Sequence, residues 1–528
     1  MTYTLKNQPV LRSASCPSSP PPSPDSPVVT ERARPLTKVP FNLRRSSLTL
    51  ATSPCPSPIQ DKSYLEALGL RLNEAVSKAL AHPSGSSLPS ELLNGRRPIP
   101  AGRGRALGIL IASYVGVCYS LLRLLIMVSS ELQVARDNKS LYRAVLRALH
   151  KPLSVLLSDL SALLLPLLSS TAFLRPSAPT LTTSIPNATQ LHAIAISDFA
   201  GELLSSFNDM ALGLDTDSRS DGLKPIRAGL VSLIARVLTP LITGIKDTMI
   251  PLVDALENPA KTTSQKVHPS IVALQSLVPV YARALARYAS THPSHTLLAS
   301  FLISIVWRAL VALSHRPMVA QSSLQVVLTE KGQHVASPAV PSVAPTGLFK
   351  FKYGSSRPAS PSTLSAAAAD AKALCKILSH FPRPQTSVAK EAVDEAFVHL
   401  EALTSFLEVA EDPFFGVGKA VGEIADDIHD LTDELPTLIA LPVLVNMRCF
   451  ANIIDPKVRT VSAFVNVPED VYRREYLAGF GRAEQYGPVV AQRILDEIST
   501  RPIVVHSECF VVWLKDRLGQ IDIDPVGQ

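Results

Sequence analysis

Serine hydroxyls next to proline or arginine are the groups in this chain best placed for covalent chemistry, because protein kinases phosphorylate such serines. Residues 44–48, Arg-Arg-Ser-Ser-Leu, have the form of a basophilic kinase site with Ser47 as the acceptor. Ser-Pro pairs have the form of proline-directed kinase sites, and they occur at Ser19, Ser23, Ser26, Ser53, Ser57 and Ser360. We expect these serines to be phosphorylated.

Residues 12–17, Arg-Ser-Ala-Ser-Cys-Pro, match the pattern Arg-Ser-x-phosphoserine-x-Pro that 14-3-3 proteins recognise. Arginine clusters in such a partner hold the phosphate, and the proline turns the bound chain out of the groove. The motif predicts that phospho-Ser15 binds a 14-3-3 protein, with Arg12 and Pro17 as neighbouring contacts. A plain spacer is the alternative interpretation of the same Ser/Pro-rich composition.

Two other clusters could do chemistry but depart from the patterns that it requires. Residues 416–422 resemble a phosphate-binding loop, yet Pro413 and Ala420 stand where such a loop has glycine and a hydroxyl residue. Glu423, Asp427 and Asp430 can share one helix face, but no second helix carries the Glu-x-x-His of a dinuclear metal site. No nucleophile elbow, zinc-protease motif or kinase set is present. The sequence therefore predicts no cofactor and no metal, and it favours a protein that is not an enzyme.

Composition predicts helices within the reducing interior of a cell. Hydrophobic residues make up 46% of the 528 residues and aromatic residues only 5%, and stretches of alternating polarity are sparse, which disfavours strands. None of the six cysteines has metal-ligand or redox spacing, and no apolar signal segment opens the chain. We expect a cytoplasmic, all-α protein.

Charge is distributed unevenly along the chain. Residues 1–150 hold 19 Lys/Arg against 8 Asp/Glu, whereas residues 385–440 hold 2 against 13. Two separately solvated faces explain this pattern. Alternatively, the basic third docks on the acidic stretch, or each region meets its own partner. Aromatic residues are not interleaved with the basic ones, so nucleic acid is not among the predicted partners.

The chain divides by composition into a disordered regulatory tail (1–61), an N-terminal helical body (62–330), a Ser/Pro-rich linker (331–365) and a C-terminal helical body (366–528). Ser63–Glu66 has capping-box form and predicts the first helix start. Histidine before proline recurs at predicted helix ends, where the imidazole can cap carbonyls. These pairs or near-pairs begin at His82, His150, His268, His292, His315 and His380.

Helices are expected at 105–135, 138–149, 152–170, 190–212, 225–256, 270–291, 294–314, 366–380, 387–411, 417–434, 437–452, 468–480 and 484–499. The short turn between 270–291 and 294–314 predicts an antiparallel hairpin. An irregular bundle or an array of such hairpins is expected, which resembles armadillo- and HEAT-type α-solenoids in its paired long helices. Residues 348–353 alternate like a strand or an extended docking segment, and 503–505 and 510–514 fit strand or helix.

Four long apolar stretches raise the question of a membrane: Ala106–Val128, Pro152–Leu174, Gly229–Ile245 and Thr296–Leu313. Each carries one charge in or near its interior: Arg123, Asp159, Arg236 and Arg308. A charge at mid-bilayer costs about 2.5–3.5 kcal/mol on insertion scales, which nearly cancels the apolar gain. Helices buried in a bundle, with the charge at the rim, explain the same pattern.

The sequence favours a non-enzymatic scaffold or adaptor that binds protein partners and is regulated by phosphorylation of its tail. The first alternative is a membrane-associated or integral protein that uses helices such as 106–128. The second is an enzyme whose site is assembled from distant helices.

Overall fold

The computed structural model describes residues 58–80, 126–176, 178–181, 185–213, 222–259, 267–317, 366–412, 415, 418–447, 460–499 and 507–519. These residues form an all-α fold without a strand among them, as the sequence predicts. They belong to one compact unit that begins at Pro58. Residues 1–57 of the predicted tail, the whole predicted linker and most of the stretch 106–128 lie outside the described residues.

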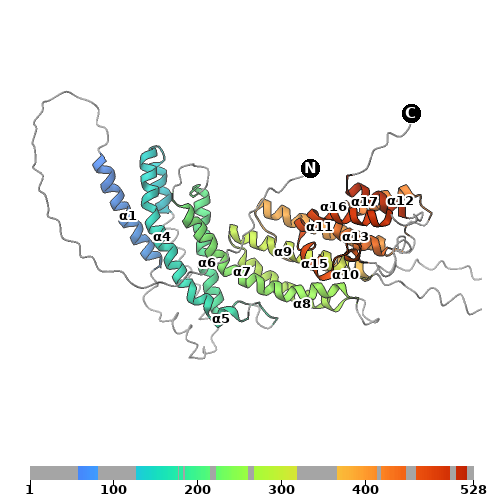
Figure 1. Ribbon diagram of the computed structural model, residues 1–528. Helices are drawn as coiled ribbons and strands as arrows, with labels where there is room; N and C mark the ends of the chain where they lie inside the picture. Colours follow the sequence, from blue (N-terminus) through green and yellow to red (C-terminus); the bar gives the residue numbers. More distant parts are fainter. Residues whose placement is uncertain are drawn as a thin grey trace, which may run out of the picture. The chain divides into compact units, whose positions relative to one another are not determined.

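Most of the helices are labelled in Figure 1. Their bounds are α1 (Pro58–Leu80), α4 (Lys139–Ser169), α5 (Thr171–Leu174), α6 (Ala188–Asp209), α7 (Lys224–Asp254), η1 (Ala255–Glu257), α8 (Pro269–Tyr288), α9 (His292–Ser314), α10 (Ala366–Leu378), α11 (Ser387–Ala410), α12 (Val421–Thr432), α13 (Thr437–Asn446), α14 (Val461–Phe464), α15 (Glu469–Glu475), α16 (Phe480–Ser499) and α17 (Ser507–Arg517). Residues 126–135 are also helical.

Several predicted helix boundaries are wrong. Helix α13 ends at Asn446 instead of 452, and α15 ends at Glu475 instead of 480. Two further differences have a clear physical reason. Helix α1 begins at Pro58, so the capping-box pattern from Ser63 lies inside it; proline suits a first helical turn, where its missing N–H is not needed. Helix α4 continues through Pro152 instead of ending there. An interior proline costs about 3 kcal/mol, but the fully buried leucines beside it each contribute about 1.5–3 kcal/mol. Leu149, Leu153 and Leu156 are all buried, and their combined burial free energy exceeds the cost of the interior proline.

The described histidines of the predicted helix ends differ in role, and one prediction is wrong, because His150 lies inside the continuous helix α4. His315 and His380 do cap, because their Nδ1 atoms lie 2.9 Å from the Val311 carbonyl and 2.7 Å from the Lys376 carbonyl. His268 and His292 instead begin helices α8 and α9, each followed by a proline in the first turn. The dipeptide His-Pro alone does not distinguish the two ends, since proline is tolerated at the start of a helix and just after its end.

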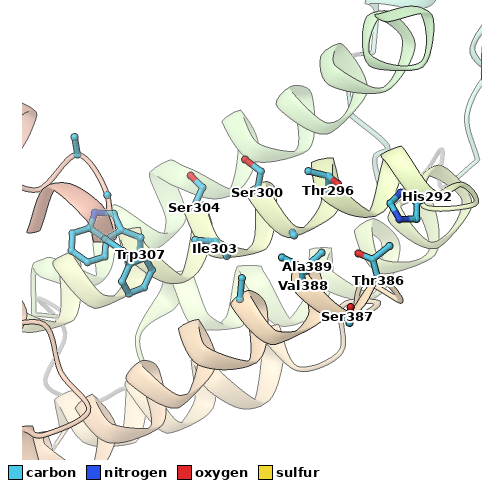
Figure 2. Close-up of a pocket in the computed structure, with 15 residues that line it drawn as sticks. His292, Thr296, Ser300, Ile303, Ser304, Trp307, Thr386, Ser387, Val388 and Ala389 are labelled. Atoms are coloured by element: carbon cyan, nitrogen blue, oxygen red, sulfur yellow. The ribbon is translucent and has the colours of Figure 1, made fainter. Parts of the chain in front are cut away.

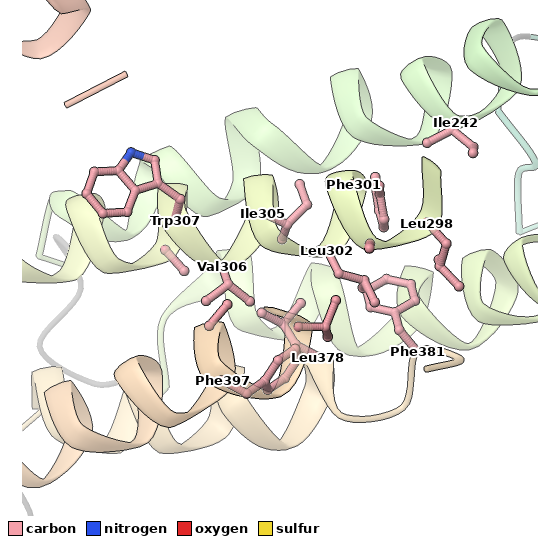
Figure 3. Packing of buried hydrophobic residues seen from close by; sticks show 14 of the residues in the cluster. Ile242, Leu298, Phe301, Leu302, Ile305, Val306, Trp307, Leu378, Phe381 and Phe397 are labelled. Atoms are coloured by element: carbon pink, nitrogen blue, oxygen red, sulfur yellow. The ribbon is translucent and has the colours of Figure 1, made fainter. Parts of the chain in front are cut away.

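Five helices pack around the main core. Helix α7 packs against α8 and α9, α8 against α10, α10 against α11, and α11 against α9, which closes a ring. Inside it, the rings of Phe301 and Phe381 meet edge to face at 5.7 Å, with Leu302 and Leu378 beside them (Figure 3). Both predicted helical bodies therefore contribute helices to the same ring.

Helices α8 and α9 follow one another directly, as predicted, but their main neighbours differ from those of a hairpin. Helix α9 packs along α7 and α11, and α8 packs along α7 and α10. Most residues of α9 are buried, on nearly every side of the helix. A single antiparallel neighbour covers only one face of a helix, so α9 needs partners on several sides.

The smaller C-terminal helices extend this core. Helix α13 packs against α9, α11 and α16, and α12 packs against α11 and α17. Residues 510–514, for which strand and helix were both open, lie in helix α17. Trp513 is buried there, and its Nε1 donates to the Thr432 hydroxyl at 2.7 Å. Residues 348–353 and 503–505 lie outside the described residues.

A buried ion pair joins helices from both sides of the predicted linker. Arg316, just after α9, donates from Nη1 to Asp370 Oδ2 of α10 at 2.7 Å, and both side chains are less than 10% exposed. The backbone N–H of His268 donates to Asp370 Oδ1 at 3.1 Å. Asp370 thus fixes the end of α9 and the start of α8 to α10.

Helix α6 comes very close to the turn before α9. A Cβ on Gly201 would lie 2.1 Å from Cγ2 of Thr291, so the contact requires glycine. One turn earlier, Asp198 accepts a hydrogen bond from the Ser290 hydroxyl. Burial raises the pKa of Asp198 to about 6, although the Ser290 hydrogen bond opposes the shift.

Replacing Asp198 with asparagine should stabilise the protein at neutral pH. Because the folded pKa is raised, the folded state binds this proton more tightly, and stability falls as pH rises from about 4 to about 6. The carboxamide oxygen of the new side chain would still accept from Ser290, without the partly buried charge. We expect Asp198→Asn to gain about 1–3 kcal/mol near pH 7.5 and nothing near pH 4. Urea unfolding at both pH values measures the difference; a gain that does not depend on pH would contradict this account.

Candidate functional site

Helix α4 carries a stripe of basic side chains. Lys139, Arg143, Arg147 and Lys151 follow at intervals of four residues, and all four are exposed. Since an α-helix has 3.6 residues per turn, such residues lie along one slowly winding side, here over about 18 Å. Asn138 begins the helix by accepting from the backbone N–H groups of Ser140 and Leu141. We call these four side chains the α4 stripe.

Acidic residues are absent from this part of the helix. No Asp or Glu lies between Asp137 and Asp159. None of the ion pairs within the described part of the chain uses a side chain of the α4 stripe. Four positive charges on one helix face repel each other, and they attract an anionic partner from solution.

Exposed apolar side chains follow the stripe along the chain. Leu163 and Leu165 lie near the C-terminal end of α4, and Leu174, Leu181 and Ile185 follow in α5 and the next loop. Leu165 is 67% exposed and Leu181 60%. Between Asp159 and Asp198, Arg175 is the only Asp, Glu, Lys or Arg in the sequence. We call these five side chains the apolar tip. Leu174 and Leu181 line one groove, and Leu165 lies about five turns after Arg147 on the same side of α4, whereas Leu163 lies on another side. Large exposed apolar side chains concentrated in one part of a molecule indicate an interaction surface.

A groove of about 740 Å³ adjoins the apolar tip. Leu174, Pro176 and Leu181 line it together with Leu277 and Tyr281 of α8. Its lining is mainly apolar and includes one charged residue, Arg175. The groove therefore offers an apolar side chain a place to insert, next to a cation.

A second groove, of about 610 Å³, runs between α9 and α11 (Figure 2). Thr296, Ser300 and Ser304 lie along one side, opposite Val388 and Ala389. Trp307 and Phe480 lie at one end, with their ring centroids 4.6 Å apart. His292 is the only titratable residue in the lining, so this groove lacks a pair of groups for general acid and base catalysis.

Several titratable groups lie together where α15 contacts η1, and their contacts indicate a structural role. Arg473 binds both carboxylate oxygens of Glu257 at 2.6 and 2.7 Å, and it also pairs with Glu469. Burial raises the pKa of the neighbouring Tyr472 and lowers the pKa of His315. None of these residues lines either groove. The cluster therefore fastens α15 to η1.

No group of three or more His, Cys, Asp or Glu within the described ranges could hold a metal ion. In the acidic helix α12, Asp427 pairs with Lys419, and Nδ1 of His429 lies 2.9 Å from Asp516. These side chains form ion pairs with other residues of the chain, and they do not converge on a common centre.

Four of the described helices are long and apolar enough to span a bilayer: Lys139–Ser169, Lys224–Glu257, Pro269–Tyr288 and His292–Ser314. Three of them overlap the apolar stretches found in the sequence, and Pro269–Tyr288 was not among those. Asp159, Arg236 and Arg308 all lie on exposed positions, as expected for charges at the rim of a bundle. The share of the apolar window that is buried is lowest in Lys139–Ser169, at 33%, and highest in His292–Ser314, at 67%.

The phosphorylation and partner-binding residues predicted from the sequence all lie outside the described residues. These are Arg12, Ser15, Pro17, Ser19, Ser23, Ser26, Ser47, Ser53, Ser57 and Ser360. The α4 stripe was missed, although its signal is present in the sequence as four basic residues spaced by four.

No protein-family model matches the chain, and no significant match was found among curated proteins or among solved structures. The function therefore has to be argued from the surface of the molecule itself.

Proposed function

We propose that this protein is a non-enzymatic helical scaffold or adaptor in the cytoplasm, which binds an acidic protein partner through the α4 stripe and the apolar tip. One observation carries the proposal: four exposed cations lie on the same helix as an exposed apolar surface near its C-terminal end, where Arg175 is the only charged residue between Asp159 and Asp198. Basic charge attracts and orients the partner, and apolar burial supplies most of the affinity.

The shape of this surface suits an amphipathic helix of a partner. Helix α4 has 31 residues, which corresponds to about 46 Å of helix. A partner helix along it would place carboxylates against the stripe and apolar side chains on the tip and in its groove. Helix-in-groove recognition uses this combination of apolar anchors and flanking charge.

Site-specific photo-cross-linking in cells tests the proposal. A photoreactive amino acid replaces Ser140, an exposed residue beside the stripe, and in a matched control it replaces Ser232, an exposed residue of α7. We expect the position-140 variant to form an adduct with an acidic protein that the position-232 variant does not form. Adducts identical from both positions, or none from position 140, would count against a partner on α4.

Membrane association is the second candidate, favoured by the four helices with bilayer-spanning length and apolarity. In that case the apolar tip inserts and the α4 stripe meets anionic headgroups. Sedimentation of the full chain with vesicles of neutral lipid, and of neutral lipid with added phosphatidylserine, distinguishes the candidates. The scaffold proposal expects the protein to stay in the supernatant with neutral vesicles. Extraction from cells only by detergent would favour the membrane.

Phosphorylation of the N-terminal residues by basophilic and proline-directed kinases is the proposed regulation, with a 14-3-3 protein bound at phospho-Ser15. The support is the sequence pattern around Arg12 and Pro17. We expect a peptide of residues 8–20 carrying phospho-Ser15 to bind a 14-3-3 protein with a Kd of about 10 µM or tighter, which corresponds to about −7 kcal/mol. The unphosphorylated peptide is the control. Equal, weak binding of both peptides would remove this part of the proposal.

A further inference from the structure

We propose that the α4 stripe also binds the chain's own residues 1–57 once their serines are phosphorylated. The proposal rests on the proposed function, because it uses the same stripe and the same phosphorylation sites. It adds a mechanism: the phosphorylated segment covers the stripe and competes with the acidic partner.

Charge is the first argument, because phosphorylation reverses the sign of this segment. Residues 1–57 contain seven Lys/Arg and two Asp/Glu, so the unmodified segment is repelled by the stripe. A kinase transfers the γ-phosphoryl group of ATP to the serine Oγ, the hydroxyl proton is released, and ADP leaves. Each phosphate adds about −1.5 to −2 charge. The predicted sites are Ser15, Ser19, Ser23, Ser26, Ser47, Ser53 and Ser57, so full modification makes the segment strongly negative.

Attachment is the second argument, because the segment leads directly into a helix that packs against α4. This helix is α1, which follows residue 57 directly. The short helix 126–135 that leads into α4 is tied to α1 as well: Arg71 pairs with Glu131 at 3.5 Å, and Tyr64 donates to the same carboxylate. Ser53 and Ser57 lie within five residues of α1, and attachment over so short a distance gives an effective concentration of about 1 mM. Weak phosphate contacts are therefore sufficient for substantial occupancy.

Spacing is the third argument. The Ser-Pro serines follow each other at three or four residues, as in Ser53 and Ser57 or Ser19, Ser23 and Ser26. Four extended residues span about 13 Å, and two steps along the stripe span about 12 Å. Two phosphates can therefore meet two cations that lie two steps apart, Lys139 with Arg147 or Arg143 with Lys151. Either pair includes one arginine, which can hold a phosphate through paired charge-assisted hydrogen bonds.

Lysine footprinting of the full chain tests this proposal. The protein is phosphorylated to completion with purified proline-directed and basophilic kinases, and an amine-reactive reagent then labels its lysines for mass spectrometry. We expect the labelling rates of Lys139 and Lys151 to fall about two- to tenfold, as for a site occupied at about 50–90%. The exposed Lys372 and Lys390 of α10 and α11 are internal controls and should not change. Phosphatase treatment should restore the original rates.

Variants and dilution identify the contact. Protection should disappear in the double variant Arg143→Glu, Arg147→Glu, and it should persist in Arg236→Glu, Arg283→Glu, which reverses two exposed arginines of α7 and α8. Protection that is unchanged on tenfold dilution shows that the segment binds its own chain.

Two results would overturn the inference: unchanged Lys139 and Lys151 rates after complete phosphorylation, or protection that survives in the α4 double variant. Cross-linking of the unphosphorylated protein to an acidic partner reports separately on the proposed function. The two proposals can therefore fail independently.

Discussion

Replacing Asp370 with alanine should lower the free energy of unfolding by about 3–5 kcal/mol, because it leaves a buried guanidinium without its counter-charge. Arg316 is 7% exposed, and its Nη1 lies 2.7 Å from Asp370. The substitution also removes the acceptor for the His268 N–H. Urea unfolding followed by circular dichroism measures the loss.

A double replacement serves as the control for this prediction. Arg316→Met with Asp370→Leu removes both charges and keeps apolar volume, so it should be within about 1–2 kcal/mol of the wild type. A loss below about 1 kcal/mol in Asp370→Ala alone would show that Arg316 finds solvent or another partner, and that the pair does not hold the two halves of the ring together.

Reversing two charges of the α4 stripe should weaken partner binding by about 10- to 100-fold. Each exposed ion pair is worth about 0.2–1 kcal/mol, and reversal replaces an attraction with a repulsion. For Arg143→Glu with Arg147→Glu, this amounts to about 0.8–4 kcal/mol. The expected 10- to 100-fold loss, about 1.4–2.8 kcal/mol, lies within that range. Both positions are exposed, so stability should change little. Titration of purified full-length protein with the cross-linked partner measures the affinity.

The matched control for this variant is Arg236→Glu with Arg283→Glu, which makes the same change in net charge on α7 and α8. Its affinity should remain within about twofold of the wild type at moderate salt. An equal loss in both variants would mean that only net charge matters, and it would remove the assignment of the partner to α4.

Much of the helical layout could be predicted from periodicity. Helix α11 lies at Ser387–Ala410, where 387–411 was expected, and α9 lies at His292–Ser314 against 294–314. The predicted helix end at Pro152 is wrong because a local rule for helix ends does not include the burial of Leu149 and Leu153 on either side of it. The neighbours of α9 could not be read from sequence order either, because its broad apolar surface is compatible with any set of packing partners.

The candidate site illustrates the same limit in another way. The sequence shows a spacing of four residues between Lys139, Arg143, Arg147 and Lys151. This spacing indicates a basic surface only if α4 is one continuous helix and that side of it is exposed. The predicted break at Pro152 hid the continuity from the stripe to Leu165. The exposure of Leu165 and Leu181 could not be predicted from the sequence either. Apolar periodicity predicts the face of a helix that packs, but it does not show which apolar residues stay exposed to solvent.

The most direct test of the scaffold account is the affinity of the full chain for its cross-linked partner in buffer without lipid or detergent, at low and high salt. We predict saturable binding that is at least about tenfold weaker at about 0.5 M salt than at about 0.05 M, because the stripe is exposed and its attraction is screened. Binding that requires anionic vesicles, or an affinity that does not change with salt, would contradict a protein-docking role for the α4 stripe.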